Sequence, residues 1–217
     1  MQVPLDLPEP WVEVEHLPDK EQAALEATIG SRLTYDDLAP DEVRREGADT
    51  FPNGARAMLV MGHQWVRLRN ADTDTEVIVR LQYSDGDDQS VSVSSVVVPF
   101  DAANEPTGAM LRTIPVAAIG AAYTRRRLEG TANLHITLTL GEGIKEDPLA
   151  PLPAASGKPE FAARVARQYL AVERAQPDVK PVDAMRSIND APLSTVQRWV
   201  TRARKYGFLP PSTPRAR

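Results

Sequence analysis

A proline-rich segment near residue 150 sets the strongest limit on how this chain folds. Residues 147–159 read DPLAPLPAASGKP, with four prolines among small residues. Proline has no backbone N–H and a fixed φ, so this stretch cannot continue a helix or form a central strand. Such a composition is typical of a semi-rigid linker between domains. We therefore expect a domain boundary here, with a linker at residues 147–158.

The charges of the chain divide at the same place. The 217 residues carry 25 Lys and Arg against 30 Asp and Glu, a net charge of −5. Residues 154–217 hold twelve basic and five acidic residues, a net charge of +7. Residues 1–153 hold thirteen basic and twenty-five acidic residues, a net charge of −12. This asymmetry indicates a basic module for a polyanion, attached to a part with another task.

We expect four segments along the chain. They are an acidic α+β domain at residues 1–146, the linker at 147–158, an all-α domain at 159–211 and a basic tail at 212–217. Because the acidic domain would repel DNA, we expect it to oligomerise or to bind a protein partner.

The composition also excludes several classes of protein. The chain has no cysteine, which excludes disulfides, thiolate zinc sites and thiol catalysis. Residues 1–10 have neither a basic start nor an apolar run, so no signal peptide is expected. No apolar stretch is long enough to cross a bilayer. We expect a cytoplasmic protein with no membrane partner and no cofactor.

The acidic part shows both helical and strand periodicity. Apolar spacing predicts helices at residues 19–33 and 114–128, with further helix starts at 34–38 and 40–43. Period-two alternation predicts strands at residues 57–68, 76–83, 90–99 and 133–140. Thr113 is expected to cap the helix that follows it, and Asp85 with Gly86 to form a hairpin turn. The fold class is α+β, with a small, mainly antiparallel sheet and helices against it.

The pattern after the linker is helical and sharper. It predicts three helices at residues 159–173, 182–188 and 194–206. Ser194 is expected to be the N-cap of the third helix, and Gly207 to stop it. In the turn at residues 189–192, Asn189 is expected to take a left-handed backbone and Pro192 to prevent the preceding helix from continuing.

The third of these helices separates into two faces on a helical wheel of roughly 100° per residue. The apolar arc consists of Val196, Trp199, Val200, Ala203 and Tyr206. The candidate DNA-binding residues are Ser194, Thr195, Gln197, Arg198, Thr201, Arg202, Arg204 and Lys205. Hydroxyl, amide and guanidinium groups are those that read base edges in the major groove. We expect base contacts from Ser194, Gln197, Arg198 and Thr201, and phosphate contacts from Arg202, Arg204 and Lys205.

Residues 194–211, STVQRWVTRARKYGFLPP, resemble the recognition helix and exit of trihelical helix-turn-helix domains. Such domains are common in actinobacterial and actinophage proteins and are similar to those of resolvases. The resemblance covers the C-terminal quarter only, and no function is carried over from it to the acidic domain. The chain departs from the family at the turn, where residues 188–195 are one residue longer than usual and Asn189 replaces a common Gly. The resemblance implies binding of double-stranded DNA.

Other patterns have simpler explanations. Residues 70–76 carry oxygen-bearing side chains at every second position, as a calcium-binding loop does. The mid-loop Gly and the distal Glu of such a loop are missing, so we prefer a hairpin loop. Residues 125–127, all Arg, are expected to end a helix, with DNA contact as the alternative. His135 is expected on the outward face of a strand. The chain has no nucleophile elbow and no phosphate loop, so we expect no metal site and no catalysis.

The sequence thus predicts a sequence-specific DNA-binding protein, a transcriptional regulator of a bacterium, a phage or a mobile element. Protein binding by the same three helices is one alternative. Two others are a phage DNA-packaging or assembly component, and a protein-interaction adaptor of a defence or counter-defence system. Because one such module binds weakly, strong affinity normally needs two modules at half-sites about one helical turn apart. We therefore expect a homo-oligomer or a protein partner.

Overall fold

The computed structural model describes residues 5–28, 63–84, 90–99, 106–140 and 147–211. These residues fall into two compact units. The N-terminal unit lies within Asp6–Asp85 and Val91–Ala122, and the C-terminal unit lies mainly within Tyr123–Arg217.

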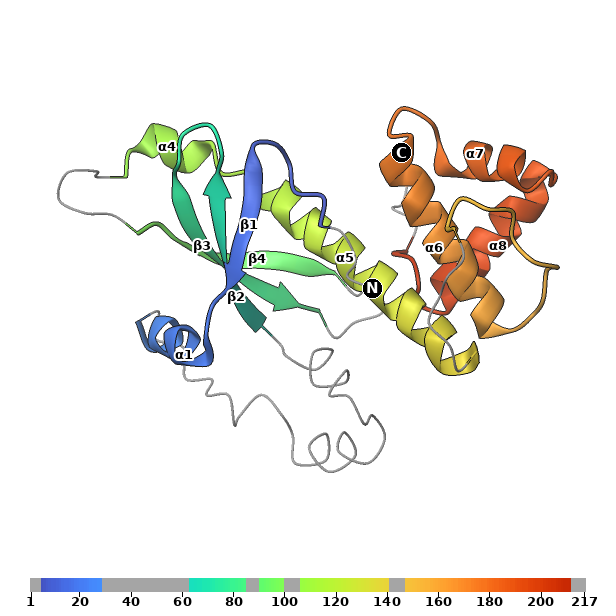
Figure 1. Ribbon diagram of the computed structural model, residues 1–217, viewed down its shortest axis with the longest axis horizontal. Coiled ribbons are helices and arrows are strands. Elements are labelled where there is room, and N and C mark those ends of the chain that lie inside the picture. The colour runs from blue at the N-terminus through green and yellow to red at the C-terminus, as the bar shows by residue number, and fades with distance from the viewer. Residues whose placement is uncertain (1–4, 29–62, 85–89, 100–105, 141–146, 212–217) are drawn as a thin grey trace, which may run out of the picture. The chain divides into compact units, whose positions relative to one another are not determined.

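The N-terminal unit is built on an antiparallel sheet of four strands in the order β1-β2-β3-β4 (Figure 1). The strands are β1 (Trp11–His16), β2 (His63–Asn70), β3 (Glu76–Tyr83) and β4 (Val91–Val97). Each strand pairs with the next one along the chain. β2, β3 and β4 correspond to three of the predicted strands, so the chain is α+β with a small antiparallel sheet, as expected.

β1 is a strand that was not predicted. It pairs with β2 through a register that shifts between Glu13 and Glu15, which is the mark of a β-bulge. Trp11 is buried, whereas Val12 and Val14 are exposed. Valine and glutamate do alternate here, but the valines face solvent, so the alternation does not mark a buried face.

The loop between β2 and β3 is a hairpin turn, as predicted for residues 70–76. The side-chain oxygen of Asn70 accepts hydrogen bonds from the backbone N–H of Asp72 at 3.0 Å and of Thr73 at 3.1 Å. Asp74 has a positive φ of 55°. The polar residues that resemble calcium ligands therefore shape the turn itself.

Both faces of the sheet carry buried residues. Val77, Val79 and Leu81 are fully buried on one face of β3, as their period-two spacing predicts. The other face carries a small core shared with α1 (Asp19–Thr28), the described part of the helix predicted at residues 19–33. This core consists of Leu17, Leu25, Trp65, Ile78 and Val97.

α4 (Gly108–Arg112) is a short helix that was not predicted. Thr113, expected to cap the following helix at its start, instead ends α4, because its backbone N–H donates to the Met110 carbonyl at 3.0 Å. The following helix begins only after Pro115, whose carbonyl accepts the N–H of Ile119 at 3.0 Å.

α5 (Val116–Leu140) is one continuous helix of 25 residues. The strand predicted at residues 133–140 is therefore wrong. Apolar residues do alternate there, but the buried residues Leu128, Ala132 and Ile136 are four apart, which is helical spacing. The helical period prevails because these three residues enter the core of the C-terminal unit, whereas Leu138 is 60% exposed.

Two further expectations change with α5. Residues 125–127 lie in the middle of the helix and not at its end, so their charges do not complement the helix dipole. His135 lies on this helix and not on a strand, and its ring centroid is 5.1 Å from that of Phe208.

The C-terminal unit contains α6 (Pro159–Ala175), α7 (Pro181–Ile188) and α8 (Leu193–Lys205), each of which packs against the other two. The predicted bounds differ from these by one or two residues. Pro159 and Pro181 open α6 and α7, where the missing N–H is not needed. The shared core includes Phe161, Val165, Leu170, Met185, Val196, Val200 and Leu209.

The turn between α7 and α8 differs from expectation in two ways. Asp190, and not Asn189, takes the left-handed backbone, with φ of 46° against −97°. Ser194 is not the N-cap of α8, because Pro192 occupies that position and Leu193 is already helical. The Pro192 carbonyl accepts the first helical hydrogen bonds at 2.9 and 3.2 Å, so the helix starts one residue earlier than predicted.

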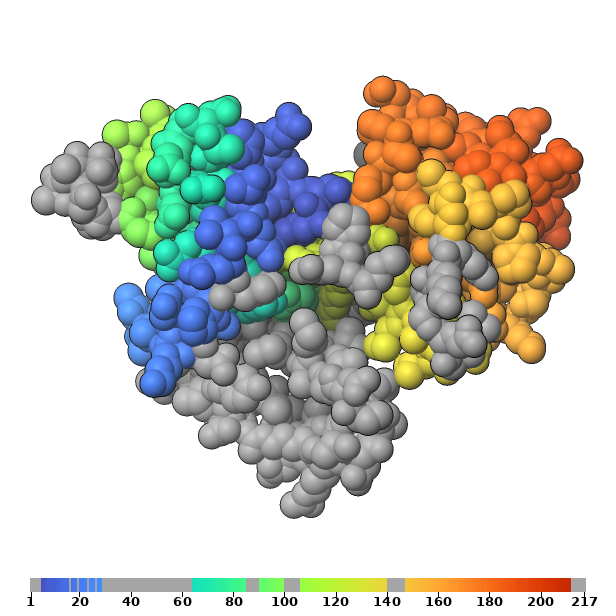
Figure 2. Space-filling view, in the orientation of Figure 1, coloured from blue at the N-terminus to red at the C-terminus, as the bar shows by residue number. Residues whose placement is uncertain are grey.

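Residues 147–158 lie against the helices of the C-terminal unit (Figure 2). They form neither helix nor strand, as the prolines require. Leu149 and Leu152 nevertheless pack against the core of that unit. The two units divide within α5, between Ala122 and Tyr123.

Some predicted features lie outside the described residues. They are residues 29–33 of the first helix, the helix starts at 34–38 and 40–43, residues 57–62, the turn at Asp85 and Gly86, and the tail at 212–217. Within the described ranges, no helix combines the length and the apolar character needed to cross a membrane.

Candidate nucleic-acid interface

α8 is anchored in the C-terminal unit by one face. Val196, Val200 and Ala203 are at most 2% exposed. The ring of Trp199 meets Phe161 edge to face, with centroids 5.4 Å apart and planes at 82°. Most of the predicted apolar arc is thus packed against α6 and α7. Tyr206 differs, because it is 42% exposed and follows the helix as its C-cap.

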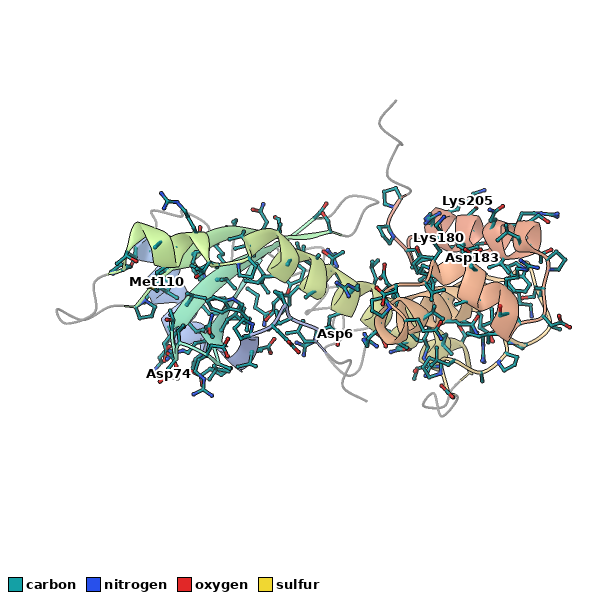
Figure 3. The ribbon with its side chains drawn as sticks, turned by 90° about the horizontal axis from the view of Figure 1, so that it is seen from above. Asp6, Asp74, Met110, Lys180, Asp183 and Lys205 are labelled. Carbon is teal, nitrogen blue, oxygen red and sulfur yellow. The ribbon has the colours of Figure 1, made fainter. Side chains whose placement is uncertain are left out.

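The opposite face of α8 is polar and open to solvent. Its exposed residues include Ser194, Gln197, Arg198, Thr201, Arg202 and Lys205, with Thr195 and Arg204 half-buried beside them. The helix carries four basic residues and no acidic residue along its whole length. Lys205 projects outward from the helices (Figure 3). The predicted DNA-binding residues therefore lie on one helix, and most of them are exposed.

Several of these side chains are available to a ligand. Ser194, Arg198 and Lys205 have no side-chain hydrogen bond or ion pair with any of the described residues. The hydroxyl of Thr201 donates to the backbone carbonyl of Gln197 at 2.8 Å, which leaves its oxygen able to accept. A free guanidinium, an amide and two hydroxyls thus share one exposed face.

The two flanking arginines differ from this group. Arg202 Nη1 donates to the backbone carbonyl of Ser156 at 3.0 Å. Arg204 Nε donates to the carbonyl of Pro210 at 3.1 Å. Each arginine expected at a phosphate thus already holds another part of the C-terminal unit.

Arg204 also interacts with Tyr169 of α6. Burial of the Tyr169 hydroxyl, and then the negative charge of Glu173, raises the pKa of this group, while the Arg204 guanidinium acts in the opposite direction. Tyr169 therefore remains a neutral hydrogen-bonding partner at physiological pH. Arg204 is thus half-buried beside Tyr169 of α6.

The chain turns back into the core after α8. Gly207 ends the helix with a φ of 74°, as predicted. The N–H of Phe208 then donates to the Ala203 carbonyl at 3.0 Å. Phe208 and Leu209 are buried, and Phe208 contacts His135 of α5. This exit fixes the C-terminal end of α8.

A partly buried polar network lies at the other end of α8, where the turn from α7 begins. The Asn189 amide nitrogen donates to Gln168 Oε1 and to the Met185 carbonyl, both at 2.7 Å. The Asn189 side-chain oxygen accepts the N–H of Leu152 at 2.7 Å. Gln168 is 1% exposed and donates to the Ala150 carbonyl at 2.8 Å. This network joins α6, the end of α7 and the proline-rich segment.

The second half of α5 supports the same unit. Its buried residues Leu128, Ala132 and Ile136 belong to the core that holds α8. Glu129 of α5 forms an ion pair with Arg174 of α6 at 2.7 Å, and the Glu129 side chain is only 8% exposed. The unit that presents α8 therefore contains α5 residues, which sequence reasoning assigned to the other domain.

Sequence reasoning located the exposed face of α8 but missed what holds it. No local pattern connects Gln168 with Asn189, or either residue with the backbone of residues 150–152, because these contacts form only in the folded unit. The contribution of α5 was readable from the spacing of Leu128, Ala132 and Ile136. The alternation of residues 134–140 obscured it.

No group of three or more His, Asp or Glu side chains within the described ranges is placed to hold a metal ion. Comparisons with protein-family models, with curated proteins and with solved structures gave no significant match. The function is therefore argued from the geometry and chemistry of α8 and its supports.

Proposed function

We propose that this protein binds double-stranded DNA sequence-specifically, with α6, α7 and α8 acting as a trihelical helix-turn-helix domain. The observation that carries the proposal is the division of α8 into a buried apolar face and an exposed polar face with no carboxylate. A recognition helix needs this division, because one face anchors it while the other enters the major groove.

The exposed side chains suit base recognition. Arg198 offers a forked guanidinium for the O6 and N7 of guanine, and Gln197 offers an amide for the N6 and N7 of adenine. Ser194 and Thr201 lie on the same face and would contact base edges with their hydroxyls. Arg198 is the residue on which most of the discrimination should depend, because bidentate contacts to guanine are the commonest specific ones.

Phosphate contacts fix the position of such a helix on the duplex. Lys205 is exposed at the end of α8 (Figure 3), and Thr195 lies near its start. Both are candidate phosphate contacts. Arg202 and Arg204 would reach a phosphate only with the donors left over from their bonds to Ser156 and Pro210.

The role that follows is regulation of transcription in a bacterium, a phage or a mobile element. The net charge of +7 on residues 154–217 supports a polyanionic ligand for this unit. The net charge of −12 on residues 1–153 supports a different task for the rest of the chain, such as self-association.

The test begins with selection of preferred sites from a random duplex library by the intact protein. Affinity for a selected site and for a random duplex is then measured over a range of salt. We expect the logarithm of affinity to fall linearly with that of salt, by about 0.9 per phosphate contacted. Arg198→Ala should lose about 1–3 kcal/mol of preference for the selected site, the value of one bidentate base contact.

Arg112→Ala is the matched control, because Arg112 is an exposed arginine on α4 in the other unit. It should change neither the preference nor the salt slope. Absence of binding to any duplex at low salt, by a protein whose helices are intact by circular dichroism, would sink the DNA proposal. It would favour protein binding by the same three helices.

A further inference from the structure

Residues 149–157, which form neither helix nor strand, cross the C-terminal unit as a strap with two anchors, one near each end of α8. The first anchor involves Asn189, four residues before Leu193 opens the helix. The second anchor involves Arg202 in the last turn of α8 and Tyr206, its C-cap. The strap is held by side chains of α6 and α8 and by the residue that ends α7.

The first anchor is partly buried, with Gln168 buried and Asn189 half-buried. Leu152 donates its N–H to Asn189, and Ala150 accepts a hydrogen bond from Gln168. Leu149 and Leu152 place their side chains against the core. Asn189 thus bonds the strap, α6 and the last turn of α7 at once, and removing its amide leaves the buried Gln168 without one of its partners, which is costly.

The second anchor is exposed. Arg202 Nη1 donates to the Ser156 carbonyl at 3.0 Å, and the Tyr206 hydroxyl donates to the Gly157 carbonyl at 3.4 Å. Both acceptors are backbone atoms of the strap just before α6 begins. An arginine held in this way is fixed in its direction, and part of its donor capacity is used before any ligand arrives.

The two anchors lie where the orientation of α8 is decided. The turn before α8 has no glycine, and Asp190 takes the left-handed backbone there. Asn189 closes this turn by bonding the Met185 carbonyl with its side chain at 2.7 Å. The strap then connects this turn to the far end of α8 through Ser156 and Arg202.

We propose that the strap sets the orientation of α8, and that Asn189 and Arg202 are its positioning residues. Arg202 acts through the Ser156 carbonyl and not on a DNA phosphate. The consequence for DNA rests on the proposed function above. The attachment of the strap and its effect on α8 do not, and they are measured without DNA.

The DNA-free experiment uses the full chain and the variants Asn189→Ala, Arg202→Ala and Lys205→Ala. Lys205→Ala removes a neighbouring cation that has no partner in the described part of the chain. Hydrogen exchange of the Leu152 amide reports the first anchor, and elastase cleavage after Ala154 or Ala155 reports the second. Amide chemical shifts along α8 report its orientation.

We expect Asn189→Ala to speed exchange at Leu152 by about tenfold, the equivalent of one lost hydrogen bond. Arg202→Ala should speed elastase cleavage and shift amides at both ends of α8. Lys205→Ala should leave exchange and cleavage as they are in the parent protein. If Asn189→Ala fails to fold, the test of the inference depends on Arg202→Ala. This variant should fold, because the Arg202 side chain is exposed.

The DNA experiment compares Arg202→Ala with Lys205→Ala on a selected and a random duplex. Arg202→Ala should keep the salt slope and lose about tenfold or more in preference for the selected site, because a misdirected helix no longer reads bases. Lys205→Ala should lower the slope by about 0.9, the value of one phosphate, and keep the preference.

Two results would overturn the inference. One is a lower salt slope for Arg202→Ala with unchanged elastase cleavage, since this makes Arg202 a phosphate contact. The other is a strap that loosens in the variants without any shift in α8. If the parent protein binds no DNA, the proposed function fails, and the DNA-free measurements still decide whether the strap positions α8.

Discussion

A single missing methyl group lets α5 approach the sheet at residue 120. A Cβ built on Gly120 would lie 2.9 Å from the carbonyl oxygen of Val91 and 3.6 Å from the Cα of Ser92. Both atoms belong to the backbone of β4, which cannot move without disturbing the sheet. Gly130, ten residues further along the same helix, would meet nothing within 4 Å.

The two glycines should respond in opposite ways to substitution by alanine. Gly130→Ala should stabilise the protein by about 0.5–1 kcal/mol, because glycine is a poor helix former and the space is open. Gly120→Ala gains the same propensity but should lose about 1–3 kcal/mol to overpacking against backbone. Urea unfolding of the full chain, followed by circular dichroism, measures both. Equal stability of the two variants would contradict the close approach of α5 to β4.

Residue identity alone does not decide which residue of a turn takes the left-handed backbone. Asn189 and Asp190 both tolerate that conformation, and Asn189 was the reasonable choice from sequence. The structure gives it to Asp190 because both ends of the Asn189 side chain are bound, to Gln168 and to Leu152. These partners lie far away in sequence, so the choice is made by tertiary contacts.

At the scale of elements, helices and strands were predicted correctly where the apolar residues fit only one spacing, either helical or alternating. α6, α7 and α8 each have a single apolar stripe with proline or glycine at their ends, and their bounds came out within two residues. The face of β3 followed from strict alternation. The exposed face of α8, and with it most of the candidate interface, was likewise visible in the sequence.

The second half of α5 shows where this approach fails. Leu134, Ile136, Leu138 and Leu140 satisfy a strand pattern, while Leu128, Ala132 and Ile136 satisfy a helical one. Local sequence supports both, and the decision comes from the core into which Ile136 packs. The strap and the polar network around Asn189 were beyond prediction for the same reason.

These two patterns make different predictions for alanine substitutions. A strand would bury Ile136 and Leu138 alike, whereas the helix buries Ile136 completely and leaves Leu138 60% exposed. Ile136→Ala should therefore cost about 2–5 kcal/mol in unfolding free energy, as for a large residue removed from a core. Leu138→Ala should stay within about 0.5 kcal/mol of the parent protein, as for surface substitutions. Comparable losses in urea unfolding would contradict the helix.

The whole molecule joins a basic unit that carries α8 to a larger acidic part. Residues 154–217 have a net charge of +7 and residues 1–153 a net charge of −12. If the chain binds DNA as proposed, its acidic part should lower the affinity, since it and DNA repel each other within about the screening length. The presence of the acidic part is explained if it self-associates and so brings the α8 of a second chain to the same DNA site.

Two modules on one duplex gain affinity because the second binds at a high effective concentration. A symmetric dimer would place two α8 helices at half-sites about 10–10.5 base pairs apart, or a multiple of that spacing, and the selected sites would be inverted repeats. One chain has a mass of 23.8 kDa. We therefore expect multi-angle light scattering of the intact protein to give twice that mass.

The selected sites and the mass test this expectation together. A dimer with inverted repeats would establish paired recognition, and footprinting should then show two protected half-sites on one face of the duplex. A large closed ring would instead favour an assembly or packaging role, and a second protein that co-purifies in equal amount would favour an adaptor. A monomer both with and without DNA, binding single unrepeated sites, would mean that the acidic part does not raise affinity by pairing modules. Specificity would then have to come from one α8 alone, and Arg198→Ala should remove about 1–3 kcal/mol of it, the value of one bidentate base contact.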